Sequence, residues 1–250
     1  MRDVGGSATL SYNLALCYHH LGLYSLSSTF AKETLAIQKE SKAKLSEFGM
    51  YCLLGVNYTI TGDAKSSKTF LDKAHKVAIK AYNTNKSSDN KVNVGATYVN
   101  YGSLFRSIEK WEIAIDYLDT ALSYLQIGTD YMLEAHYQKT CCLMATMNYQ
   151  HYAKTLEEGI KLARGNETYT MLFKALQCMA NPSLTTAAIL YNRIIPYMLK
   201  NNYLYAALDY CVFLSKFYKE KGKGHKKRAL EAESIEANIR RKMHKGGLAK

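Results

Sequence analysis

Apolar and small residues recur at helical spacing along most of the chain, and the pattern is clearest between Tyr98 and Tyr124. This stretch contains, at intervals of three, six, three, three and four residues, Gly102, Phe105, Trp111, Ala114, Tyr117 and Ala121. Such intervals place residues on one helical face, and they are broken once, at residues 108–110. The pattern predicts two antiparallel helices joined by a tight turn, with small residues where the backbones approach and aromatic residues around them.

Similar arrangements recur before and after this stretch. The predicted repeats cover about residues 7–41, 45–82, 94–125 and 129–163, and the fourth copy is the least regular. The polar segment 83–93 is expected to be a solvated loop. One helix pair cannot bury its apolar faces alone, so the copies must stack. The sequence therefore predicts an all-α fold, a right-handed superhelical array of TPR-like helix pairs, with residues 1–250 in a single domain.

A further helical part is predicted from about residue 167 to residue 243. Pro196 falls inside one of its helices, which we expect to kink or end near Ile195, because proline lacks an N–H and its ring crowds the preceding turn. Residues 244–250 are expected to form a flexible tail. The chain begins almost directly in a repeat, so we expect it to be a fragment of a longer protein.

The spacing resembles the tetratricopeptide (TPR) repeat, whose pattern is an early aromatic residue and a leucine, a small residue, an aromatic residue, and then Gly, Tyr, Ala and Ala. At the first repeat the chain reads Tyr12-Asn13-Leu14-Ala15, and near the C-terminus it carries Leu204, Tyr205, Leu208 and the segment FYKEK at 217–221. Together these residues resemble the Rap-type peptide receptors of Gram-positive bacteria. The resemblance covers essentially the whole chain.

This resemblance implies a cytoplasmic receptor that binds a short signalling peptide in its concave groove, in quorum-sensing-type regulation. Binding would tighten the superhelix and signal to an effector domain or response regulator. Members of the family carry an N-terminal helix-turn-helix domain or three-helix bundle, and this sequence has neither. DNA would therefore be contacted only through a domain absent from this chain, and a homodimer is left open. The alternative is a generic TPR scaffold that holds a segment of a protein partner.

Charge and composition narrow these functions. The formal net charge is +12, and residues 216–250 contribute 12 Lys or Arg and only 4 Glu. Glutamates interrupt this basic helix, so nucleic-acid binding through it ranks below both the peptide receptor and the TPR scaffold. No apolar run is long enough to cross a bilayer, and no signal peptide is evident, so no membrane association is expected. The six cysteines occupy helical patterns without a C-x-x-C pair, so we expect free thiols.

Motifs for catalysis are missing from the sequence. It contains no H-E-x-x-H, no glycine-rich phosphate loop and no G-x-S-x-G. We therefore expect no enzymatic activity, no catalytic residue, no metal site and no cofactor.

Projection of the first helix of each repeat onto the concave side gives the candidate peptide site. The predicted contacts are Tyr12, Asn13, His20, Asn57, Asn100, Ser103, Arg106, Tyr137 and Gln138. An asparagine amide both donates and accepts, so it suits the N–H and C=O groups of an extended peptide. The resemblance assigns this role to the places of Asn13 and Asn100. The alternative is that each amide caps a turn or faces water.

Arg106 is the basic side chain projected into this groove. Its guanidinium could form a two-pronged pair with a peptide carboxylate. The alternative is a surface arginine paired with Glu109.

Overall fold

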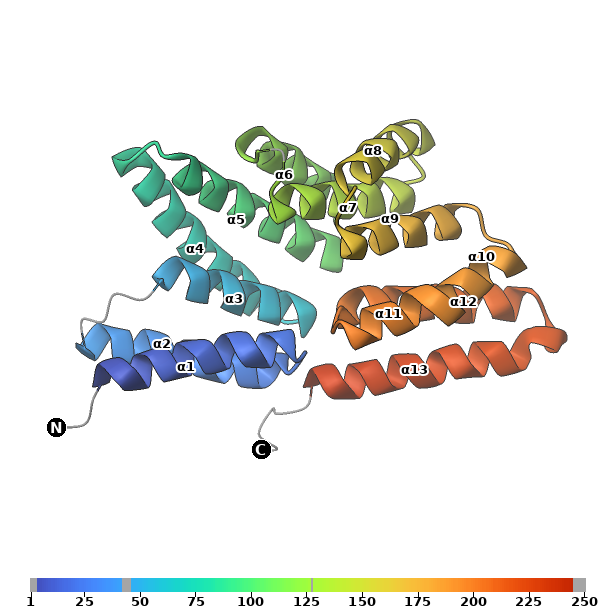
Figure 1. The fold of residues 1–250 in the computed structure, drawn as a ribbon, viewed down its shortest axis with the longest axis horizontal. Coiled ribbons are helices and arrows are strands. Elements are labelled where there is room, and N and C mark those ends of the chain that lie inside the picture. The colour runs from blue at the N-terminus through green and yellow to red at the C-terminus, as the bar shows by residue number, and fades with distance from the viewer. Residues whose placement is uncertain (1–3, 42–45, 127, 245–250) are drawn as a thin grey trace.

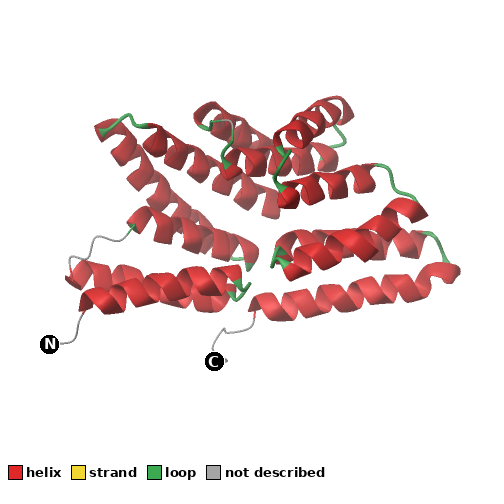
Figure 2. Ribbon diagram, viewed as in Figure 1, coloured by secondary structure: helices red, strands yellow, loops and turns green. Residues whose placement is uncertain are grey.

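The computed structural model describes residues 4–41, 46–126 and 128–244, and within these ranges it contains helices and loops but no strand (Figure 2). The first eight helices form four antiparallel pairs. They are α1 (Val4–His20) with α2 (Tyr24–Ser41), α3 (Glu47–Ile60) with α4 (Ala64–Thr84), α5 (Ser88–Ser107) with α6 (Trp111–Tyr124), and α7 (Asp130–Ala145) with α8 (Tyr149–Leu162). The predicted all-α array of TPR-like helix pairs is confirmed.

The C-terminal part continues the stack. Its elements are α9 (Glu167–Ala180), α10 (Leu184–Ile189), the π turn η1 (Leu190–Ile194), α11 (Ile195–Lys200), α12 (Leu204–Glu220), the short 3-10 turn η2 (Lys223–His225) and α13 (Lys226–His244). His244 thus ends a helix, and the rest of the predicted tail lies outside the described residues. A core of side chains from α7 to α13 holds this part together.

The two helices of a pair approach each other closely where small residues lie between them. A Cβ added to Gly102 would lie 2.6 Å from Leu118 of the partner helix, and Ala114 and Ala121 are fully buried. Gly55 has the same relation to Leu71, with a Cβ distance of 2.4 Å. The predicted turn at 108–110 is present, although Trp111 beside it is only partly buried.

One local prediction was wrong, and the prediction for the helix that contains Pro196 found an irregularity at the expected place. The predicted loop 83–93 is helical over most of its length, because Ser87 caps α5 by accepting a hydrogen bond from the N–H of Asn90. The regular α geometry of the helix that contains Pro196 is interrupted where the kink or end near Ile195 was predicted, since α10 ends at Ile189 and α11 begins at Ile195. Its irregularity takes the form of the π turn, in which the N–H of Ile195 bonds the carbonyl of Leu190. This wider turn accommodates the proline ring.

The two ends of the stack meet. In Figure 1 the α1–α2 turn lies beside the start of α12 and the end of α13. Gly22 in that turn has a φ of +74°, and a Cβ there would lie 2.4 Å from the Leu204 side chain and 3.7 Å from Lys242. Tyr24 of α2 is buried in the same core as the C-terminal helices. The first and last helices of the superhelix are therefore in contact, and this contact closes the concave side.

Candidate functional site

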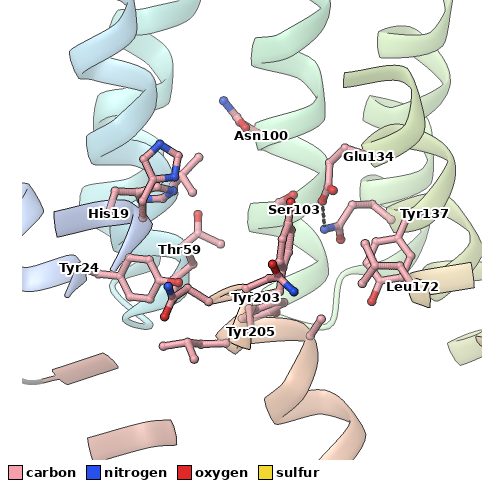
Figure 3. Close-up of a pocket in the computed structure, with 18 residues that line it drawn as sticks. His19, Tyr24, Thr59, Asn100, Ser103, Glu134, Tyr137, Leu172, Tyr203 and Tyr205 are labelled. Atoms are coloured by element: carbon pink, nitrogen blue, oxygen red, sulfur yellow. Dashed lines mark hydrogen bonds between the residues drawn. The ribbon is translucent and has the colours of Figure 1, made fainter. Parts of the chain in front are cut away.

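A cavity of about 430 Å³ lies where the concave face of the array meets the start of α12 (Figure 3). Its walls come from α1, α2, α3, α5, α7, α9 and the α11–α12 turn. The lining residues are His19, His20, Tyr24, Val56, Thr59, Ile60, Asn100, Ser103, Glu134, Tyr137, Gln138, Leu172, Asn201, Asn202, Tyr203, Leu204, Tyr205 and Ala206. First helices of all four predicted repeats contribute, so the stacking itself builds the site.

One wall rests on a chain of hydrogen bonds that joins α1, α2 and α3. Nδ1 of His19 lies 2.7 Å from Oδ1 of Asn57, and Nδ2 of Asn57 donates to Oγ of Ser27 at 2.8 Å. Ser27 and Asn57 are completely buried. Burial lowers the pKa of His19, the bond to Asn57 opposes this effect, and His20 adds to the lowering. The imidazole is therefore held neutral near neutral pH.

The opposite wall carries the one carboxylate among the lining residues. Glu134 accepts a hydrogen bond from Nε2 of Gln138 at 2.5 Å and another from the Tyr169 hydroxyl at 3.0 Å. Oε1 of Gln138 is buried and has no hydrogen-bond partner among the described residues. Beside it, the hydroxyls of Tyr137 and Tyr210 lie 3.1 Å apart. This wall offers hydrogen-bond acceptors to a bound molecule.

Arg106 lies behind the cavity wall, where its side chain contacts other side chains of the protein. Its Nη1 is 3.2 Å from Oδ2 of Asp209 in α12, and its guanidinium stacks on Tyr205 at 4.8 Å from the ring centroid. Burial works against the charged form, but Asp209 and the neighbouring groups leave the pKa of Arg106 well above its ordinary value. The proposed pairing with Glu109 is absent among the ion pairs of the described residues, and the side chain is 8% exposed.

The structure brings together five of the nine predicted contacts. His20, Asn100, Ser103, Tyr137 and Gln138 line the cavity. Their role in binding stays a proposal.

The other four predicted contacts do not line the cavity. Tyr12 packs against the apolar cluster of the first two repeats, and Asn13 is exposed. Asn57 and Arg106 are buried, and Asn57 has both polar atoms bonded within the protein. Helical projection gave the correct side for these two but not the depth, which depends on the neighbouring helices.

Several lining residues were missed from the sequence. Glu134 and Tyr24 were not projected, and neither was the segment 201–206 that closes the cavity. That segment lies beyond the repeats, and it reaches the concave face only because the superhelix closes. No local sequence pattern signals a contact made at that range.

Solved structures identify the fold. No protein-family model matches the sequence, and no curated protein matches it. A Rap protein complexed with competence and sporulation factor is similar with a TM-score of 0.78 at 17% identity, over 97% of this chain and 66% of that one. The chain has the Rap-type fold. The Rap conjugation gene regulator of the plasmid pLS20, in complex with the Phr* peptide, is similar with a TM-score of 0.74 at 17% identity, over 100% of this chain and 67% of that one.

A third similar structure concerns enzymatic activity. Aspartyl phosphate phosphatase F from Bacillus subtilis has a TM-score of 0.71 at 15% identity, over 100% of this chain and 64% of that protein. This chain thus spans about two thirds of the length of these Rap-type structures. What those proteins bind or catalyse belongs to them, and the fold is what the similarity establishes here.

Proposed function

We propose that this chain is the sensory part of an intracellular peptide receptor, which binds a short signalling peptide in the concave cavity. The observation that carries the proposal is the cavity itself, built by every first helix of the repeats and closed by the α11–α12 turn. Two of the Rap-type structures with this fold are peptide complexes. Peptide binding controls an effector domain or a response regulator in quorum-sensing-type regulation.

The size and chemistry of the cavity support a short peptide as the ligand. A volume of about 430 Å³ is near the lower end of the range for small-ligand pockets, about 300–1,000 Å³. It accommodates a few residues of an extended chain and excludes a folded partner. Peptide N–H and C=O groups lose water on entry and need partners, which Asn100, Gln138 and Asn201 supply.

No helix of the described residues is long and apolar enough to span a membrane.

Catalysis is not part of the proposed role of the residues around the cavity. The described residues hold no cluster of His, Cys, Asp or Glu suited to a metal ion. Since one similar structure is a phosphatase, an aspartyl-phosphate hydrolysis assay with a phosphorylated response regulator tests the non-enzymatic proposal directly.

A scaffold for a protein partner is the second candidate. Met147 and Tyr149, at the α7–α8 turn, are 70% and 64% exposed. Large apolar side chains with this exposure suit a protein contact. A scaffold of this kind would bind a long segment of its partner and would show little affinity for free short peptides.

Calorimetry and thermal shift with a randomised heptapeptide library distinguish the two functions. A receptor gains several degrees in unfolding temperature from a selected heptapeptide. Asn100→Ala should weaken that peptide by about five- to a hundredfold, because a buried peptide group loses its partner. Asn13→Ala, outside the cavity, is the matched control and should bind normally. If no heptapeptide binds while longer segments do, the scaffold is the correct function.

A further inference from the structure

The hydrogen bonds behind His19 have one consistent direction. The Ser27 hydroxyl lies 2.7 Å from the carbonyl oxygen of Ala15, and a carbonyl only accepts, so the single hydroxyl proton goes to Ala15. Oγ of Ser27 must then accept from Asn57, which turns the NH₂ of the amide toward Ser27. Oδ1 of Asn57 is left facing His19.

This direction determines which nitrogen of His19 carries the proton. Since Oδ1 of Asn57 only accepts, Nδ1 of His19 is the donor. In a neutral imidazole the other nitrogen, Nε2, then holds a lone pair. Nε2 has no hydrogen-bond partner among the described residues, and His19 lines the cavity. The Nδ1 edge of the ring faces the wall, which leaves the Nε2 edge toward the cavity.

We propose that Nε2 of His19 accepts a hydrogen bond from a main-chain N–H of the bound peptide, and that Asn57 is the positioning residue that fixes this tautomer. The proposal rests on the proposed function. It gives Asn57 an indirect role in recognition in place of the direct peptide contact predicted from the sequence.

The surroundings of the ring favour a neutral acceptor. Tyr24 of α2 lies edge-on to His19 at 5.4 Å, and His20 lies at 5.9 Å. The other titratable groups around the cavity are Glu134 on the far wall and the phenols of Tyr137, Tyr203 and Tyr205, with Lys242 at Asn202 near the closure. Burial lowers the pKa of His19, so the ring has a lone pair for a ligand rather than a second proton.

Two replacements of His19 separate the roles of the ring nitrogens. An Asn side chain places its polar group near the Nδ1 position and keeps the bond to Asn57, but it has nothing at the Nε2 position. A Gln side chain places its amide near Nε2. We expect His19→Asn to lower the affinity for the best heptapeptide of a randomised library by about five- to a hundredfold. His19→Gln should keep most of the affinity.

Backbone N-methylation of that heptapeptide identifies the donor. Each N–H is replaced in turn by N–CH₃, and affinities are measured with wild type and His19→Asn. At one position the two changes should be strongly non-additive, since both remove the same hydrogen bond. Additive losses at every position, or equal binding by His19→Asn and wild type, would overturn the proposal while leaving the peptide receptor intact. Failure of every heptapeptide to bind would overturn both.

The tautomer can be read without a peptide. A long-range proton–nitrogen NMR spectrum, assigned by comparison with His19→Gln, should show a protonated Nδ1 and an unprotonated Nε2 in the free protein. Asn57→Leu should remove this preference and weaken the same heptapeptide. A protonated Nε2 in the wild-type protein would contradict the proposal.

Discussion

Arg106 carries a buried positive charge that Asp209 balances. The two side chains differ in exposure, since Arg106 is 8% exposed and Asp209 is 37% exposed. An orphaned charge costs more where water cannot reach it. Loss of the carboxylate should therefore be worse than loss of the guanidinium, even though both changes break the same ion pair.

Asp209→Asn should destabilise the fold by about 3–5 kcal/mol, because it leaves the Arg106 guanidinium buried without a counter-ion. Arg106→Met should cost less, about 1–3 kcal/mol, since water reaches the remaining Asp209. Urea unfolding of the two variants gives the comparison. An equal or larger loss for Arg106→Met would show that the stacking on Tyr205 dominates the contact.

Gly102 tests the close approach of α5 and α6. An Ala there gains up to about 1 kcal/mol in helix propensity, but its Cβ meets the fully buried Leu118. Overpacking of this kind costs about 1–3 kcal/mol, so after the gain in helix propensity Gly102→Ala should destabilise the protein by up to about 2 kcal/mol net. Gly224→Ala, with open space around the Cβ, is the control in the same thermal unfolding experiment.

At the scale of elements, Ser87 determines where α5 begins. Ser87→Ala removes the side-chain acceptor for the N–H of Asn90 and should cost about 0.5–2 kcal/mol. Ser88→Ala, at the first helical residue, should cost little. If the two variants unfold at the same urea concentration, the cap contributes nothing to the start of this helix.

The helix pairs could be predicted from the sequence because their signal is local. Gly102, Ala114 and Ala121 mark the contacts of α5 with α6 within a single repeat. The start of α5 could not be predicted, since the polar run around Ser87 suits a loop and a helix cap equally. Near Pro196 the sequence predicted a kink or an end but not the π turn. There the packing of Leu190 and Ile194 in the core keeps the helix continuous.

The candidate site was predictable only in part for a related reason. Asn100, Ser103 and Gln138 could be placed by helical projection, which needs only the repeat register. The depth of Asn57 and Arg106 depends on Ser27 and Asp209, which lie far from them in sequence. Long-range partners of this kind leave no periodic signal.

At the scale of the whole molecule, three histidines that are wholly or partly buried make stability depend on pH. Burial is the largest cause of a lowered pKa for His19, His75 and His136. For His136 the lowering by burial outweighs the raising by Glu158 and Asp119, and Lys139 adds to the lowering. For His75 the nearby Asp72 opposes the effect of burial. Each imidazole therefore takes up a proton more readily in the unfolded chain than in the folded protein.

The stability that these three neutral imidazoles contribute should therefore be fully present above the ordinary histidine pKa of 6.5, and it should be lost as the pH falls below that value. Urea unfolding at about pH 7.5 and about pH 5.5 measures the difference. His19→Gln, which removes one of the titrating groups, should reduce it. A protein that is equally stable at both pH values would show that these rings are protonated without cost in the fold.

Because Gly22 contacts Leu204, the first helix pair packs against the last helices as well as against the second pair. In an open solenoid each repeat depends only on its neighbours in sequence, and the terminal repeats fray first. Here the first pair has a neighbour on both sides, as every unit of a ring does. Leu204→Ala should therefore speed amide hydrogen exchange in α1 and α2 as well as in α12, while α5 and α6 keep their protection. Exchange that changes in α12 alone would mean that the ends touch without sharing stability, and that the first repeat unfolds independently of the last helices.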